Sequence, residues 1–126
     1  MTRWVALSAV LAIHEEQLAE HHGLDGIRDQ GLLESALHRP RDLQSYGKPG
    51  LADLAAAYAF GIARNRPFLH GNKRTSAVVT RLFLRLNEHD LDASQAERLA
   101  IWLALGAGET TEQALGDWMR SRLVKS

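Results

Sequence analysis

The segment LADLAAAYAFGIA, residues 51–63, constrains the fold of this chain more than any other feature. Leu54, Tyr58 and Ile62 recur at the spacing of one helical face. The opposite face, which carries alanines and Phe60, is nearly as apolar. A helix that is apolar on all sides must be enclosed by other elements, so this segment predicts a central helix inside the hydrophobic core.

Two helices and a loop are predicted ahead of this central helix. Ser8 is expected to cap a helix that runs to about Gly23. A second, short helix is expected after Asp29 and should stop at Pro40, because proline disrupts a helix interior. Residues 39–50, RPRDLQSYGKPG, are polar and turn-rich, which predicts a loop or flap.

Three more helices are predicted after the central one. A break at residues 67–71 precedes an apolar stripe that ends near Asn87. Two capping-box pairs then mark further helix starts, Ser94 with Glu97 and Thr110 with Gln113. Strand signals are nearly absent, and a minor strand pair around Trp4 and Leu91 is the most that we expect. The expected fold is therefore all-α, a single domain over residues 1–126 with about six helices.

The composition argues against several classes of protein. No apolar run approaches the length of about 20 residues that a membrane helix needs. The N-terminus lacks the basic region and cleavage site of a signal peptide, so a cytoplasmic protein without a membrane partner is expected. The absence of cysteine excludes disulfides and thiolate chemistry. The net charge of zero argues against a protein that coats nucleic acid, so no direct nucleic-acid binding is expected.

The charges are nevertheless unevenly distributed. No acidic residue lies between Asp53 and Glu88. The basic residues in this interval are Arg64, Arg66, Lys73, Arg74, Arg81 and Arg85. The middle of a neutral protein is thus a cationic segment, which favours an anionic ligand or partner over a merely solvated surface.

The sequence PFLHGNKRTS, residues 67–76, predicts an anion site within this segment. Gly71 and Asn72 directly precede the expected helix, whose first turn offers unpaired N–H groups and the positive end of the helix dipole. Lys73 and Arg74 add full positive charges. Phosphate is the natural ligand, although the spacing of a P-loop is missing. The alternative is a solvated helix start, which the lack of balancing acids makes less favourable.

This stretch, with the preceding AAAYAFGIARNR, resembles the Fic/Doc family, and in particular the death-on-curing (Doc) toxins. Their motif reads His-Pro-Phe-x-Asp-Gly-Asn-Lys-Arg-Thr. The stretches GLDGIRDQGLLESALHRP and LALGAGE extend the similarity over most of the chain. Lys73, and Ala77 in place of a second arginine, are similar to the Doc branch rather than to the larger Fic group. The resemblance implies the helical Fido fold of this family.

The resemblance also implies a function and partners. Doc proteins transfer the terminal phosphate of ATP to a translation elongation factor, whereas the Fic branch mostly transfers AMP, which is the alternative here. The chain has no Ser/Thr-x-x-x-Glu-Gly/Asn inhibitory helix, so a separate antitoxin is the expected partner. Pro67 and Phe68 would anchor the loop. The positions that carry over as the phosphate cradle are Gly71, Asn72, Lys73 and Arg74.

Two positions of the motif depart from the family. Arg66 stands where the family has its catalytic histidine, and His70 stands where it has the acid that holds magnesium. A guanidinium stays protonated and cannot serve as a general base. Magnesium prefers carboxylate and phosphate oxygens, so His70 is a poor ligand and no metal site is expected from these residues. A carboxylate would have to come from elsewhere, for instance Asp53 or Glu15.

Three hypotheses follow from these departures. In the first, the fold and the phosphate cradle persist in an inactive or strongly weakened toxin. In the second, Arg66 replaces the positive charge of the metal and His70 acts as the base. In the third, the chain is a non-catalytic module that binds the antitoxin, or binds nucleic acid through Arg81 and Arg85, with any DNA role more readily supplied by the antitoxin.

The remaining candidates have mostly structural interpretations. His14 is expected to be a partly buried histidine with its hydrogen bonds satisfied rather than a ligand. His21 and His22 are adjacent and face different ways, which does not suit a metal pair. In the loop of residues 39–50, Tyr46 or Lys48 would be placed to touch a partner, an expectation that comes from the resemblance.

Overall fold

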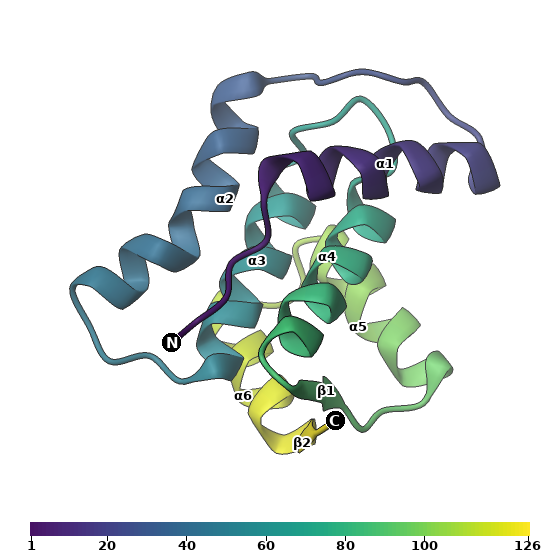
Figure 1. Ribbon diagram of the computed structural model, residues 1–126. Helices are drawn as coiled ribbons and strands as arrows, with labels where there is room; N and C mark the ends of the chain where they lie inside the picture. The colour runs from purple at the N-terminus through teal and green to yellow at the C-terminus, as the bar shows by residue number, and fades with distance from the viewer.

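The computed structural model describes all of residues 1–126 and consists of six helices with a small two-stranded sheet, shown in Figure 1. In chain order the elements are α1 (Leu7–His21), α2 (Gln30–Ser45), α3 (Leu51–Asn65), α4 (Asn72–Leu86), β1 (His89–Leu91), α5 (Gln95–Gly106), α6 (Glu112–Arg122) and β2 (Leu123–Lys125). The predicted all-α fold is confirmed. None of the helices is both long and apolar enough to cross a membrane.

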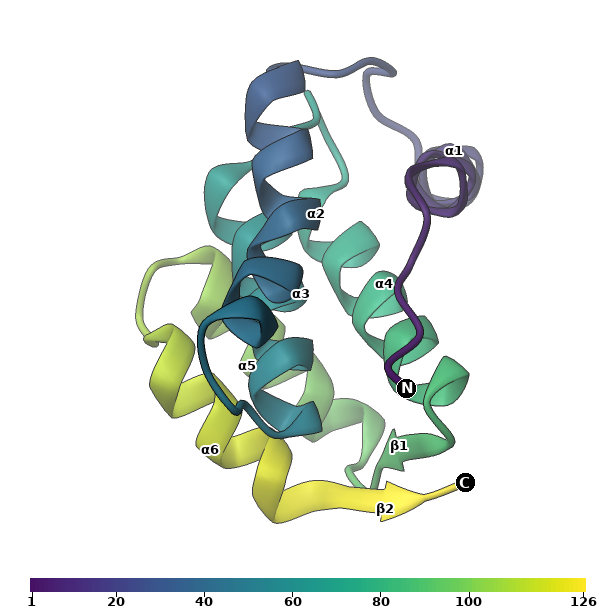
Figure 2. The same ribbon diagram turned by 60° about the vertical axis from the view of Figure 1, so that its left-hand side comes forward.

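Helix α3 is the centre of the molecule, as its sequence predicts. Ten of its 15 residues are buried, and it packs against α2, α4 and α6 (Figures 1 and 2). At Gly61 an added Cβ would lie only 3.2 Å from the Cα of Ala36 in α2, so glycine permits the close packing of these two helices. The central helix therefore fixes the position of the loop that follows it.

Two predictions for the first helices are wrong. Helix α1 begins at Leu7, after Ala6 as a cap without a side-chain hydrogen bond, so Ser8 lies inside the helix. Helix α2 continues through Pro40 to Ser45 instead of ending at the proline. Pro40 is buried, and the packing of α2 on α3 outweighs the backbone hydrogen bond that a proline cannot make. The predicted loop of residues 39–50 is thereby reduced to residues 46–50.

The cap predictions for the last two helices differ in outcome. Ser94 caps α5, since its hydroxyl accepts a hydrogen bond from the amide of Glu97 at 3.1 Å. Thr111 rather than Thr110 caps α6, and its hydroxyl accepts from the amide of Ala114 at 3.0 Å. The capping-box pattern selects Thr110, because Gln113 lies three residues after it, and this prediction is wrong by one residue.

The strand pair involves Leu91 but not Trp4. Strand β1 pairs antiparallel with β2, so that Leu91 lies opposite Leu123 near the C-terminus. Figure 2 shows this small sheet below α4 and beside the lower end of α6. Trp4 instead stacks on Phe83 of α4, with ring centroids 6.0 Å apart. The expectation of a strand at Trp4 is therefore wrong, since the partner of β1 is the C-terminal segment β2.

Candidate functional site

The motif loop, residues 66–71, joins α3 to α4 and is framed by two residues with left-handed backbone. Arg66 has φ 51° and ψ 59°, and its amide donates to the carbonyl of Ile62 to close α3. Gly71 has φ 82° and directly precedes α4. A Cβ at Gly71 would find ordinary contacts of 3.6 Å, so the positive φ and not the lack of space makes glycine favourable.

Asn72 holds the motif loop together from the inside. Its Oδ1 accepts a hydrogen bond from the amide of Phe68, and its Nδ2 donates to the carbonyl of Phe68, both at 3.0 Å. The residue is only 7% exposed. Its side chain is thus engaged within the loop, and the backbone N–H is the group left for a ligand. The predicted cradle residue has a structural role that the sequence pattern did not indicate.

His14 of α1 supports the motif loop from the outside. Its Nε2 donates to the carbonyl of His70 at 2.8 Å, and its ring stacks on Phe68 with centroids 3.7 Å apart. Because a carbonyl can only accept, the proton of the neutral His14 ring must be on Nε2. His14 is 3% exposed, which confirms it as a buried histidine with a hydrogen-bond partner.

The connector between α1 and α2, residues 22–29, runs antiparallel to the motif loop. The amides of Arg28 and Asp29 both donate to the carbonyl of Pro67, at 2.7 and 3.0 Å. In return, the amide of Leu69 donates to the carbonyl of Gly26 at 3.1 Å. Backbone pairing of this kind leaves no periodic signal in the sequence, so sequence reasoning missed this connection.

The side chain of Arg28 strengthens the same connection. Its guanidinium donates to the carbonyls of Asn65 and Arg66, both at 2.7 Å. These carbonyls lie at the C-terminal end of α3, where the negative end of the helix dipole favours a cation. Arg28 therefore fixes the backbone of Arg66, while the Arg66 side chain itself is exposed and forms no ion pair.

The side chain of His70 points to the connector as well as to solvent. Its Nδ1 accepts a hydrogen bond from the amide of Leu24 at 2.9 Å. Gly23 packs so closely that an added Cβ would lie 3.1 Å from both Cβ and Nδ1 of His70. One ring nitrogen of this exposed residue is therefore already engaged within the chain.

All six predicted site residues line one groove. They are Arg66, His70, Gly71, Asn72, Lys73 and Arg74. The backbone amides of Asn72, Lys73 and Arg74, in the first turn of α4, have no backbone partner. The side chains of Lys73 and Arg74 are exposed and form no ion pair. The arrangement suits an anion, and the roles of these residues in binding remain predictions.

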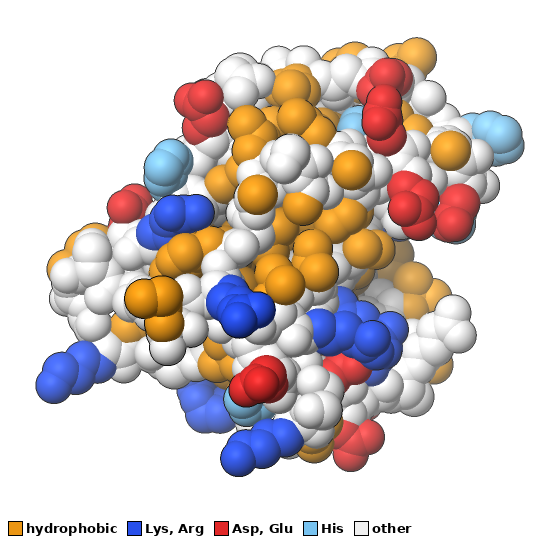
Figure 3. All heavy atoms as spheres, in the orientation of Figure 1, with side chains coloured by type: hydrophobic (Ala, Val, Ile, Leu, Met, Phe, Trp, Pro, Cys, Tyr) orange, Lys and Arg blue, Asp and Glu red, His pale blue; other side chains and the backbone are white.

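The groove has a volume of about 1510 Å³ and extends along α4 toward α5 and the end of α1. In Figure 3 the surface is hollowed on the right-hand side, with lysine and arginine side chains at the lower edge of the hollow. Six cationic side chains but only two carboxylates line it. Between its charged ends lies an apolar wall that includes Val78, Leu82, Leu99 and Leu103.

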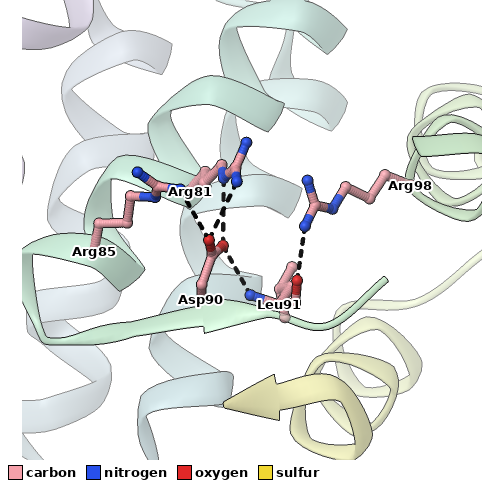
Figure 4. Close-up of polar contacts among 5 residues, drawn as sticks. All are labelled: Arg81, Arg85, Asp90, Leu91 and Arg98. Atoms are coloured by element: carbon pink, nitrogen blue, oxygen red, sulfur yellow. Dashed lines mark hydrogen bonds and ion pairs between the residues drawn. The ribbon is translucent and has the colours of Figure 1, made fainter. Parts of the chain in front are cut away.

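The far end of the groove, by β1, holds a cluster around Asp90 that Figure 4 shows. Arg81 and Arg85 point from α4 toward the carboxylate, each with a guanidinium nitrogen 3.2 Å from Oδ2. Arg98 of α5 donates to the carbonyl of Leu91 at 2.7 Å. The predicted basic stripe is therefore partly neutralised, by an acid that lies just beyond the acid-free interval.

The carboxyl of Asp90 has a lowered pKa. Burial raises this pKa, but hydrogen bonds from Arg81, the Leu91 amide and Arg85, together with the charge of Arg81, outweigh that effect. The side chain is 16% exposed, and its lowered pKa keeps it ionised at neutral pH. Asp90 offsets one of the positive charges at this end of the groove, whereas Arg66, Lys73 and Arg74 at the motif loop form no ion pair.

The residues around the motif loop do not fit the magnesium that the resemblance implies. No group of three or more His, Asp or Glu side chains is placed to hold a metal. Asp53 lies at the other end of α3, about 20 Å along the helix, and pairs with Arg120. Glu15 is exposed on α1 and does not line the groove. Neither carboxylate considered from the sequence reaches the site.

Comparisons of the sequence with known proteins find a family and two similar proteins. Residues 4–84, which extend from before α1 to within α4, match the model of the Fic/Doc family. The chain is similar to the protein kinase doc of Escherichia phage P1, with 28% identity over 120 residues that cover 94% of each chain. It is also similar to the toxin Doc of Mycolicibacterium smegmatis, with 40% identity over 80 residues, 58% of this chain and 61% of that protein.

Proposed function

This chain belongs to the Fic/Doc family, and on that premise we propose that it is a Doc-type toxin of a toxin–antitoxin module whose motif loop has lost the groups that transfer phosphate. Similar proteins are named as a toxin and as a protein kinase, which supports the first part of this proposal. The second part rests on one observation: the two altered motif positions supply neither a base nor a metal ligand.

Arg66 does not replace a general base. Its guanidinium is protonated at any physiological pH and has no acceptor lone pair. Its backbone is fixed by Arg28, so the side chain starts from a defined point at the rim of the groove. What remains available at this position is a positive charge, which binds a phosphate but does not take a proton from a hydroxyl.

His70 does not take over the role of the base in this arrangement. A base needs a free lone pair within reach of the hydroxyl that it deprotonates. The Nδ1 lone pair of His70 already accepts the amide of Leu24. The rewired enzyme, in which Arg66 acts for the metal and His70 as the base, is therefore less well supported than the inactive or weakened toxin.

The ancestral reaction that best fits this chain is transfer of the terminal phosphate of ATP to a translation elongation factor. The identity of Lys73 and Ala77 favours this over AMP transfer, by resemblance to the Doc branch. The unpaired amides at the start of α4, with Lys73 and Arg74, supply the contacts that a triphosphate requires. We propose that phosphate binding is retained although transfer is not.

ATP binding to the full chain tests this proposal. Equilibrium titration should give saturable binding that Arg74→Ala weakens by about tenfold, because a charge-assisted phosphate contact is lost. Lys125→Ala is the matched control, since Lys125 is an exposed cation in β2, outside the groove. Equal affinity of both variants would contradict the assignment of the phosphate to the start of α4.

A second observation favours a role in binding a separate antitoxin. Val78, Leu99 and Leu103 are 37, 61 and 49% exposed, and all three line the groove between its cationic ends. An amphipathic antitoxin segment with acidic residues would cover this apolar wall. Leu99→Lys should weaken the complex with the antitoxin encoded beside the toxin by tenfold or more, whereas Leu24→Lys, an exposed leucine outside the groove, should not.

A further inference from the structure

We propose that His70 fastens the 22–29 connector to the motif loop and is held in its Nε2–H tautomer. The position then presents a hydrogen-bond donor for an anion where related proteins place a carboxylate for a metal. The fastening role does not depend on the proposed function. Only the identity of the anion as phosphate rests on it.

The tautomer follows from the hydrogen bonds of the ring. A neutral imidazole has one donor nitrogen and one acceptor nitrogen. The amide of Leu24 can only donate, and it lies 2.9 Å from Nδ1 of His70. Nδ1 must therefore carry the lone pair, which places the proton on Nε2. The backbone carbonyl of His70 is engaged separately, by His14.

The fastening role follows from the position of His70 in a row of hydrogen bonds, here called the seam, between the connector and the motif loop. Two neighbouring contacts, from Leu69 to Gly26 and from Arg28 to Pro67, join the same connector to the same loop through backbone atoms alone. The bond from Leu24 to His70 is the side-chain contact that extends this seam toward α1. Gly23, at φ +136°, lets the connector pack closely against the ring, since an added Cβ would lie only 3.1 Å from Nδ1.

The same bond makes His70 unsuitable for a cation. A metal requires a ring nitrogen with a free lone pair. Nδ1 is occupied by Leu24, and Nε2 carries the proton, so a metal ion would have to displace both. A donor N–H at the edge of a groove with surplus positive charge is suited to an anion instead.

Nuclear magnetic resonance of the full chain tests the tautomer directly. With 15N labelling at about pH 8, the ring of His70 should show the Nε2–H pattern. A scalar coupling across the hydrogen bond should also connect the Leu24 amide nitrogen with Nδ1 of His70. A ring protonated on Nδ1, or a missing coupling, would overturn the proposal without affecting the assignment of the phosphate site.

A matched pair of variants tests the fastening role. In His70→Asn the amide oxygen can occupy the place of Nδ1, whereas in His70→Gln the amide lies farther out, near the place of Nε2. Hydrogen exchange at the Leu24 amide should be nearly unchanged in His70→Asn and about fivefold to tenfold faster in His70→Gln, the effect of one lost hydrogen bond. Equal exchange in the two variants would overturn the role.

Manganese alone serves as the probe for metal binding, because the bound ion broadens nearby resonances. The amides of Leu24 and Gly71 should broaden no more than those of other exposed residues as manganese is added to the unmodified chain. Selective, saturable broadening at these two amides that disappears in His70→Gln would show that His70 holds a metal. That result would overturn the proposal.

Discussion

The imidazole of His14 donates a hydrogen bond to the carbonyl oxygen of His70 over 2.8 Å, which ties helix α1 to the loop before α4. His70 in turn binds the amide of Leu24 through its own ring. A buried histidine thus supports the backbone of an exposed one, and the exposed ring holds the connector. The motif loop is therefore fixed from two sides.

Replacing His14 with alanine should destabilise the fold by about 2–4 kcal/mol. The change leaves a cavity beside Phe68 and removes the donor to the carbonyl of His70. His14→Gln should lose less, because its amide Nε2 can still donate to that carbonyl. Urea unfolding measures both free energies, and equal stability of His14→Ala and the unmodified chain would contradict the supporting role.

Replacing Asn72 with alanine should lower the free energy of unfolding by about 2–3 kcal/mol. The change removes two buried hydrogen bonds and leaves the amide and carbonyl of Phe68 unpaired. Asn65→Ala is the control. Asn65 is half-buried at the end of α3, and its side chain makes no hydrogen bond, so the change should be within about 0.5 kcal/mol. If Asn72→Ala instead weakened ATP binding at unchanged stability, Asn72 would be a ligand contact rather than a loop fastener.

The arrangement of helices was largely predictable, because it follows from local periodicity. The apolar alanines around Tyr58 marked the central helix, and the cap at Ser94 lies where expected. The helix end predicted at Pro40 is wrong, because packing on α3 stabilises the helix beyond the proline. The local pattern of the chain contains no information on that packing.

The sequence motif places Gly71, Lys73 and Arg74 close together, and the structure puts them in one groove, while their role in binding stays a prediction. The contacts of the motif loop were not predictable from the sequence. The engagement of Asn72 within the loop and the bond from Leu24 to His70 depend on three-dimensional proximity. For the same reason the sequence did not indicate that Asp90 neutralises part of the basic stripe.

The ion pairs of Asp90 should make stability depend on pH in the acid range. The lowered pKa of Asp90 means that the folded state favours the carboxylate over the protonated acid. The ion pairs therefore stabilise the fold fully above the unfolded-state pKa of 3.8. This stabilisation is lost as the pH falls through the lower pKa of the folded state. Asp90→Asn should therefore lower the free energy of unfolding by about 1 kcal/mol at pH 7, a modest effect because Arg81 and Arg85 are half exposed. The effect should become progressively smaller below pH 3.8.

Urea unfolding of the Asp90→Asn variant and the unmodified chain between neutral and strongly acid pH measures this difference. Asp92→Asn is the matched control, because Asp92 is exposed two residues away and forms no ion pair. Its effect should be small at every pH. A cost for Asp90→Asn that stays constant down to the lowest pH would contradict the charged interaction.

We propose that the scaffold is that of a Doc-type kinase without its base and its metal ligand. Transfer of label from the terminal or the alpha phosphate of ATP to bacterial elongation factor measures whether it retains activity. The chain is compared with Arg66→Leu as a control for lost charge, and with the double variant Arg66→His and His70→Asp, which restores the family motif. We expect terminal-phosphate label on the factor with the restored variant alone. Transfer by the unmodified chain at a comparable rate would contradict the claim.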